Sequence, residues 1–294
     1  MKDAARLAAY FIAIVLLGAF LAPLLFWSAQ SLAAHGVFPF LAKYDFDTFF
    51  RRAILVAAVL LLWPLLCVSH VRGLADLGLV PNARWVRDLL SGAVLSIIPL
   101  LLCGYLFIAL HIYSFRHVLA WPRLAKVILA AIGVPLIEET FFRGIVLGLL
   151  LRTGRKLPPI IAVSALFALV HFLKGPERVV VTIVTWTSGF QSIAHAFAGF
   201  GDPMVVAAAF ATLFVIGWIL GDARVLTRSL WLPIGLHAGW IFASGTFSWL
   251  ARRQIIAFPW LGKNVLVGIV PLCLAAVTWI IMRLWLRYDR ASEV

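Results

Sequence analysis

Two adjacent glutamates and an arginine lie inside an otherwise apolar segment, where charged side chains are costly. The segment reads AIGVPLIEETFFRG and contains Glu138, Glu139 and Arg143. At bilayer depth each charge costs about 2.5–3.5 kcal/mol on insertion scales. Glu139 and Arg143 are four residues apart, so on a helix they share a face and can neutralise each other. Glu138 lies about 100° around the helix and needs another partner, a proton or water.

Two histidines in other apolar segments could join this group. His171 follows Phe167 by four residues, which places both on one face of a helix. His237 lies between Gly235 and Gly239, and small residues at this spacing let another helix approach closely. A single histidine in an apolar span serves a structural hydrogen bond as often as a function. Two of them, on helices that could converge on the glutamate helix, favour a site.

These residue types support two kinds of hydrolytic chemistry. His171, His237 and Glu138 would supply a zinc site with an open position for water. No His-Glu-x-x-His signature is present, so the spacing itself does not demand a metal. Alternatively, Glu138 takes a proton from water while a histidine steadies the nucleophile or the oxyanion. A buried charge network that only locks helices together is the structural alternative.

The composition places these residues in a membrane. Of the 294 residues, 64% are apolar and 13% are charged, whereas soluble domains are about half apolar and a quarter charged. Uncharged runs recur along the whole chain, and an apolar stretch of roughly 20 residues spans a bilayer as a helix. A soluble enzyme, a disordered chain and a disulfide-stapled module are therefore excluded.

The fold class expected from these runs is an all-α, polytopic membrane protein with about eight transmembrane helices and a four-helix catalytic core. Helices are favoured because lipid cannot satisfy backbone hydrogen bonds. The predicted spans are 7–27, 53–71, 89–112, 124–151, 157–173, 203–221, 229–250 and 264–282. Residues 179–201 carry no charge but many polar side chains, and we interpret them as interfacial or re-entrant; a ninth span is the alternative.

Charge patterning suggests the partners and the location. The net charge of +13 comes from basic residues that flank the apolar runs, where they meet lipid phosphates. This pattern predicts contact with the lipid bilayer and no nucleic-acid partner. A weak bias of basic residues favours a multi-pass protein of the cell inner membrane with a cytoplasmic N-terminus. The three cysteines lie in apolar runs and are interpreted as structural.

The sequence resembles the CAAX protease and bacteriocin-processing (CPBP, or Abi) family of intramembrane endopeptidases. The family's Glu-Glu-x-x-x-Arg motif matches Glu138, Glu139 and Arg143, and its Phe-x-x-x-His motif matches Phe167 and His171. The third motif, His-x-x-x-Asn or Asp, is half matched. His237 is present after the run SLWLPIGL, but Ile241 stands where the amide or acid should be.

The resemblance divides the chain into N-terminal helices at 1–123, a catalytic core at 124–250 and a C-terminal helix with a basic tail at 251–294. It implies that Glu138 activates water with help from His171, while His237 stabilises the oxyanion. Glu139 and Arg143 would be supporting catalytic residues.

The implied partner is a membrane-bound protein or peptide, either of CAAX type or a bacteriocin or sorting-tail precursor. Because Ile241 cannot donate a hydrogen bond, a noncatalytic scaffold or immunity protein with the same fold is one alternative. A transporter with a proton relay is another.

Overall fold

Helices make up almost all of the computed structural model, which describes residues 2–172, 183–198, 203–255, 258–262 and 267–291. In those ranges the only strands are β1 (Tyr113–Phe115) and β2 (Ala251–Arg253), which pair antiparallel with Ser114 opposite Arg252. The all-α prediction is therefore confirmed.

Each of the eight predicted spans coincides with a long helix. These are α1 (Lys2–Ala34), α2 (Phe46–Val68), α4 (Trp85–Ala109), α5 (Trp121–Glu139), α7 (Leu157–Phe172), α9 (Pro203–Thr227), α10 (Trp231–Leu250) and α11 (Ile269–Ala291). The fourth span continues beyond α5 through the segment η2 (Thr140–Val146) and α6 (Leu147–Leu151). The shorter elements are η1 (Pro39–Lys43), α3 (Leu74–Leu77) and α8 (Ser188–Ala198).

Five of the described helices are long and apolar enough to cross a membrane. They are α1, α2, α4, α9 and the Ile269–Asp289 part of α11. Their length and composition support an integral, multi-pass membrane protein. That α5, α7 and α10 also cross the bilayer stays a prediction. So do the inner membrane and the cytoplasmic N-terminus.

The chain forms two compact units. The first contains residues 1–72 and 170–201, and the second contains residues 73–169 and 202–294. These units follow the packing of the helices. The predicted division into 1–123, 124–250 and 251–294 follows the motifs instead, and it stays a prediction.

In the first unit, α1, α2 and α8 pack together. The N-terminus of α2 is capped by Asp45, whose side chain accepts a hydrogen bond from the backbone N–H of Thr48 at 3.0 Å. Gly189 of α8 lies against the backbone of Ala19, where no side chain would fit. Helix α8 has 11 residues, and residues 173–182 and 199–202 lie outside the described ranges, so the interfacial assignment of 179–201 stays a prediction.

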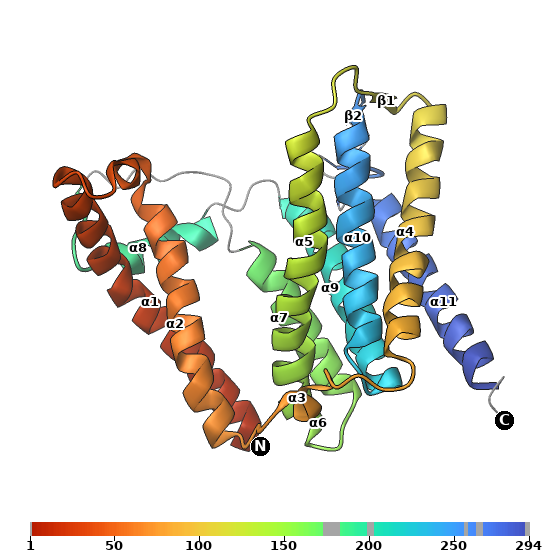
Figure 1. The fold of residues 1–294 in the computed structure, drawn as a ribbon, viewed down its shortest axis with the longest axis horizontal. Helices are drawn as coiled ribbons and strands as arrows, with labels where there is room; N and C mark the ends of the chain where they lie inside the picture. The colour runs from red at the N-terminus through yellow and green to blue at the C-terminus, as the bar shows by residue number, and fades with distance from the viewer. Residues whose placement is uncertain (1, 173–182, 199–202, 256–257, 263–266, 292–294) are drawn as a thin grey trace. The chain divides into compact units, whose positions relative to one another are not determined.

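In the second unit, α4, α10 and α5 lie side by side (Figure 1). A Cβ on Gly92 of α4 would come within 2.6 Å of the carbonyl oxygen of Leu232 on α10. A Cβ on Gly235 would overlap the carbonyl oxygen of Leu89 in return. The close helix approach predicted at Gly235 is therefore confirmed, and the partner helix is α4, which precedes the motif region.

Candidate active site

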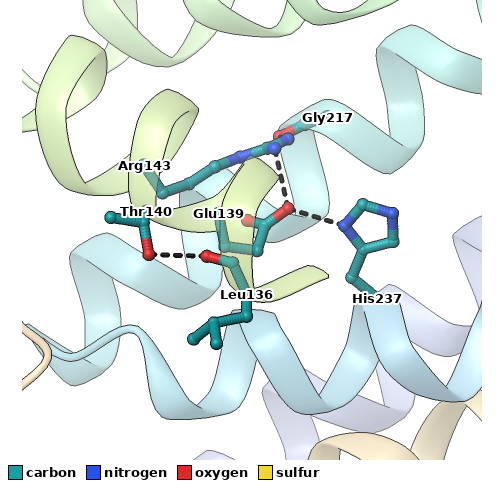
Figure 2. Close-up of polar contacts among 6 residues, drawn as sticks. All are labelled: Leu136, Glu139, Thr140, Arg143, Gly217 and His237. Carbon is teal, nitrogen blue, oxygen red and sulfur yellow. Dashed lines mark hydrogen bonds and ion pairs between the residues drawn. The ribbon is translucent and has the colours of Figure 1, made fainter. Parts of the chain in front are cut away.

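The helix that carries Glu138 and Glu139 changes from α-helical to π-helical winding directly after these residues. Glu139 is the last residue of α5, and the next segment, η2, is a π-helix. Its end is marked by the backbone N–H of Leu147, which donates to the carbonyl of Phe142, five residues earlier. The Thr140 hydroxyl donates back to the Leu136 carbonyl at 2.6 Å (Figure 2). Segments of π-helix are rare and often mark functional positions in helices.

Glu139 is the centre of a buried polar network. Its Oε1 accepts a hydrogen bond from Nη1 of Arg143 at 2.9 Å and contacts Nδ1 of His237 at 2.7 Å (Figure 2). The side chains of Glu139 and Arg143 are 0% exposed. The ion pair predicted from the four-residue spacing is confirmed, and the contact with His237 joins α5 to α10.

The proton between Glu139 and His237 belongs to the imidazole. A carboxylate that faces a guanidinium is ionised and only accepts hydrogen bonds. Nδ1 of His237 is therefore the donor, and the carboxylate fixes the ring's tautomer as in other carboxylate–histidine pairs. In this state Nε2 is an acceptor when the ring is neutral. It becomes a donor only when the ring is doubly protonated.

Arg143 is held by a backbone carbonyl and an aromatic ring as well as by Glu139. Its Nη2 donates to the carbonyl oxygen of Gly217 on α9 at 3.2 Å. Its guanidinium carbon lies 4.4 Å from the centre of the Phe167 ring, and such cation–π contacts strengthen when water is excluded. Phe167 also meets His237 edge to face, with ring centroids 6.1 Å apart. The buried charge is thus compensated from three helices, α5, α7 and α9.

The carbonyl of Gly217 reaches Arg143 because α7 and α9 pack closely. A Cβ on Gly217 would lie 3.0 Å from Cα of Ser164, and one on Gly221 would lie 3.2 Å from Ile160. The sequence does not predict that the Gly217 carbonyl contacts Arg143, nor that the aromatic ring of Phe167 does. The spacing of Gly217 and Gly221 is the small-residue pattern of close helix pairs and could have indicated the contact.

The two other candidates, Glu138 and His171, differ from Glu139 in exposure or in the unit to which they belong. Glu138 is partly exposed, in contrast to the fully buried Glu139. His171 occupies the last turn of α7, one turn beyond Phe167, and belongs to the first compact unit. Its position relative to Glu138 and His237 therefore stays a prediction. Ile241 is partly buried on α10, one turn after His237.

Metal ligation depends on the same side chains. Among the residues that the structure describes, no group of three or more His, Cys, Asp or Glu side chains is arranged to hold a metal ion. The metal set of Glu138, His171 and His237 stays a prediction, because His171 belongs to the other compact unit.

Comparison with known proteins connects this site to a protease family. Residues 119–243 match the family model described as type II CAAX prenyl endopeptidase Rce1-like. This match agrees with the resemblance to the CPBP family that the motifs indicate. The matched range covers less than half of the chain, but it contains the first two motifs and the half-matched third. No curated protein and no solved structure matches.

The CPBP match and the apolar helices together support a membrane-embedded protease, which is a hydrolase that acts on peptide substrates. Helices α1, α2 and α11 lie outside the matched range. Helix α4 also lies outside it, although α4 packs on the helix that carries His237.

Proposed function

We propose that this protein is an intramembrane endopeptidase in which Glu138 activates the attacking water. The observation that carries the proposal is the commitment of Glu139, whose Oε1 is shared by Arg143 and His237 in a fully buried position. A carboxylate held in this way is suited to positioning. The adjacent Glu138 is partly exposed, although its Oε2 is shielded from solvent, so it is the member of the pair that lies nearer to water.

The proposed reaction moves one proton through Glu138. The carboxylate takes a proton from water as the oxygen attacks the carbonyl carbon of the scissile bond, which gives a tetrahedral oxyanion. The same group then returns the proton to the amine nitrogen as the C–N bond breaks. His171 assists the water, and His237 donates from Nε2 to the oxyanion in its doubly protonated form. Glu139 stabilises that charged ring.

The proposed substrate is a protein or peptide held in the membrane near the scissile bond. The family description names CAAX prenyl endopeptidases, which favours a C-terminal tail with a prenylated cysteine. A bacteriocin or sorting-tail precursor is the other substrate class that the family resemblance implies.

Reconstituted protein tests the proposal directly. The full chain in proteoliposomes is incubated with two reporter peptides of identical sequence, one prenylated at a C-terminal CAAX cysteine and one anchored by an apolar helix. Mass spectrometry of the fragments identifies the cleaved bond. Cleavage of either reporter by the wild-type protein supports the proposal. Failure to cleave both, with the protein folded, favours the scaffold alternative to which Ile241 points.

The same preparation separates the two hydrolytic routes. In the metal-free route, extensive dialysis against a chelator leaves the cleavage rate unchanged. In the zinc route, the rate falls and returns when zinc is added back. Elemental analysis of the purified protein gives the metal content independently of activity.

A further inference from the structure

Arg224, near the end of α9, lacks a counter-charge within the described part of the chain. No described residue forms an ion pair or side-chain hydrogen bond with it, although its Nε is shielded from solvent. A shielded guanidinium without an acceptor is unfavourable. Its presence here points to an anionic partner other than the residues that the structure describes.

Neighbouring acids are committed to other cations or to the backbone. Asp222, two residues before Arg224, accepts hydrogen bonds from Arg283 at 2.7 and 2.8 Å and from the indole N–H of Trp279 at 2.8 Å. Asp76 of α3 accepts a hydrogen bond from the backbone N–H of Gly73 at 3.3 Å. Among the described residues, neither carboxylate forms an ion pair with Arg224.

The guanidinium of Arg224 lies directly against Gly78, which has no side chain to displace it. The φ of Gly78 is +77°, in the left-handed region, and a Cβ there would lie 2.8 Å from the guanidinium carbon of Arg224. The carbonyl of Gly78 accepts a hydrogen bond from the backbone N–H of Leu230 at 2.9 Å, which fixes this turn against the start of α10.

Another basic side chain, Lys156, lies near the level of Arg224 along the helices. Helices α7 and α9 run antiparallel, with Ile160 against Gly221. Lys156 directly precedes α7, so the same register puts it close to the level of Arg224 along the helices. Lys156 is exposed, so it adds positive charge where a ligand could approach.

Aromatic residues place this group at a membrane surface. The rings of Trp85 and Trp231, at the starts of α4 and α10, pack with centroids 5.1 Å apart. The Trp231 indole donates to the carbonyl of Val80, two residues after Gly78, at 3.5 Å. Tryptophan is enriched at the headgroup level of membranes, so Arg224 lies close to the depth of lipid phosphates.

We propose that Arg224 binds the phosphate of an anionic lipid headgroup, with Lys156 strengthening the attraction. Guanidinium is the side-chain group that matches a phosphate with two parallel hydrogen bonds. This site is separate from the Glu139 network and does not depend on the proposed proteolysis.

Native mass spectrometry of the full chain tests the proposal. Protein is released from nanodiscs of phosphatidylcholine alone or mixed with phosphatidylglycerol, and the retained lipid is counted. Wild-type protein should retain phosphatidylglycerol, and Arg224→Gln should bind it at least tenfold more weakly. Arg224→Lys should fall between them because a single point charge remains. Arg123→Gln, which removes an exposed cation from the start of α5, should bind as the wild type does.

A competition arm identifies the source of the phosphate. Displacement of the lipid by millimolar inorganic phosphate indicates a site for the free anion, and retention of the lipid indicates a headgroup site. If Arg224→Gln does not fold, the test uses Arg224→Lys and the rise in the thermal unfolding midpoint when phosphatidylglycerol is added. Equal lipid retention by the wild type and both Arg224 variants would overturn the proposal. So would a wild-type protein that shows no preference for phosphatidylglycerol.

Discussion

His237 donates a hydrogen bond from Nδ1 to Oε1 of Glu139 across 2.7 Å, and this contact joins residues 98 positions apart in the chain. The same oxygen accepts from Arg143. One buried carboxylate thus sets the orientation of both an imidazole and a guanidinium.

Glu139→Gln should destabilise the protein more than Glu138→Gln does. The amide removes the counter-ion of a fully buried arginine, and breaking a buried ion pair costs about 3–5 kcal/mol. Glu138 is partly exposed, so its amide should cost only about 1 kcal/mol. Thermal unfolding in detergent measures both. Equal midpoints for the two variants would contradict the assigned roles.

Phe167→Leu should loosen the network without adding or removing charge. The Phe167 ring lies against the Arg143 guanidinium and the edge of His237. Losing the aromatic face in a buried position should cost about 2–3 kcal/mol. Phe247→Leu is the matched control, because its ring is also buried and packs on Tyr113, and no cation–π contact with it is observed among the described residues. A similar loss in both variants would show that packing alone matters at these positions.

Gly235→Ala should weaken the contact between α4 and α10. The added methyl group would meet the backbone carbonyl of Leu89, which cannot rotate away. Overpacking of this kind costs about 1–3 kcal/mol. Gly133→Ala serves as the control, since a Cβ there meets nothing within 4 Å. The control should stabilise helix α5 by about 0.5–1 kcal/mol. Chemical denaturation of both variants gives the comparison, and a stabilising Gly235→Ala would refute the packing argument.

Ile241→Asn should increase cleavage if the family's oxyanion donor is the missing component. Ile241 lies one turn after His237 on α10, at the motif position where the family has an amide or acid. One oxyanion donor is worth roughly 10²–10³ in rate. The turnover number on the better reporter peptide measures the gain. An unchanged rate would indicate that the oxyanion is stabilised by other groups.

The sequence predicted the helices well because their signal is local. Uncharged runs located all eight long helices, and the spacing of Glu139 and Arg143 predicted their ion pair. The glycines around His237 predicted that another helix approaches closely. They could not identify it as α4, since any helix with a small-residue face satisfies the same pattern.

The missing parts of the site depend on tertiary contacts. No local signal marks Glu139 rather than Glu138 as the partner of His237, because that choice depends on how α5 and α10 face each other. The carbonyl of Gly217 is a backbone group, and every residue has one. The π-helical winding of η2 lacks a residue type that would predict it. The relation of His171 to Glu138 stays a prediction for the same reason.

Comparing Glu138→Gln with the wild-type protein in one cleavage assay tests the central claim most directly. Both proteins are first brought to matched amounts of folded material by their thermal unfolding curves, and initial rates are then measured on the same membrane-anchored reporter. If Glu138 deprotonates the attacking water, the variant should lose at least about 10²-fold in rate while it unfolds at nearly the wild-type temperature. A folded variant that cleaves at the wild-type rate would contradict the account.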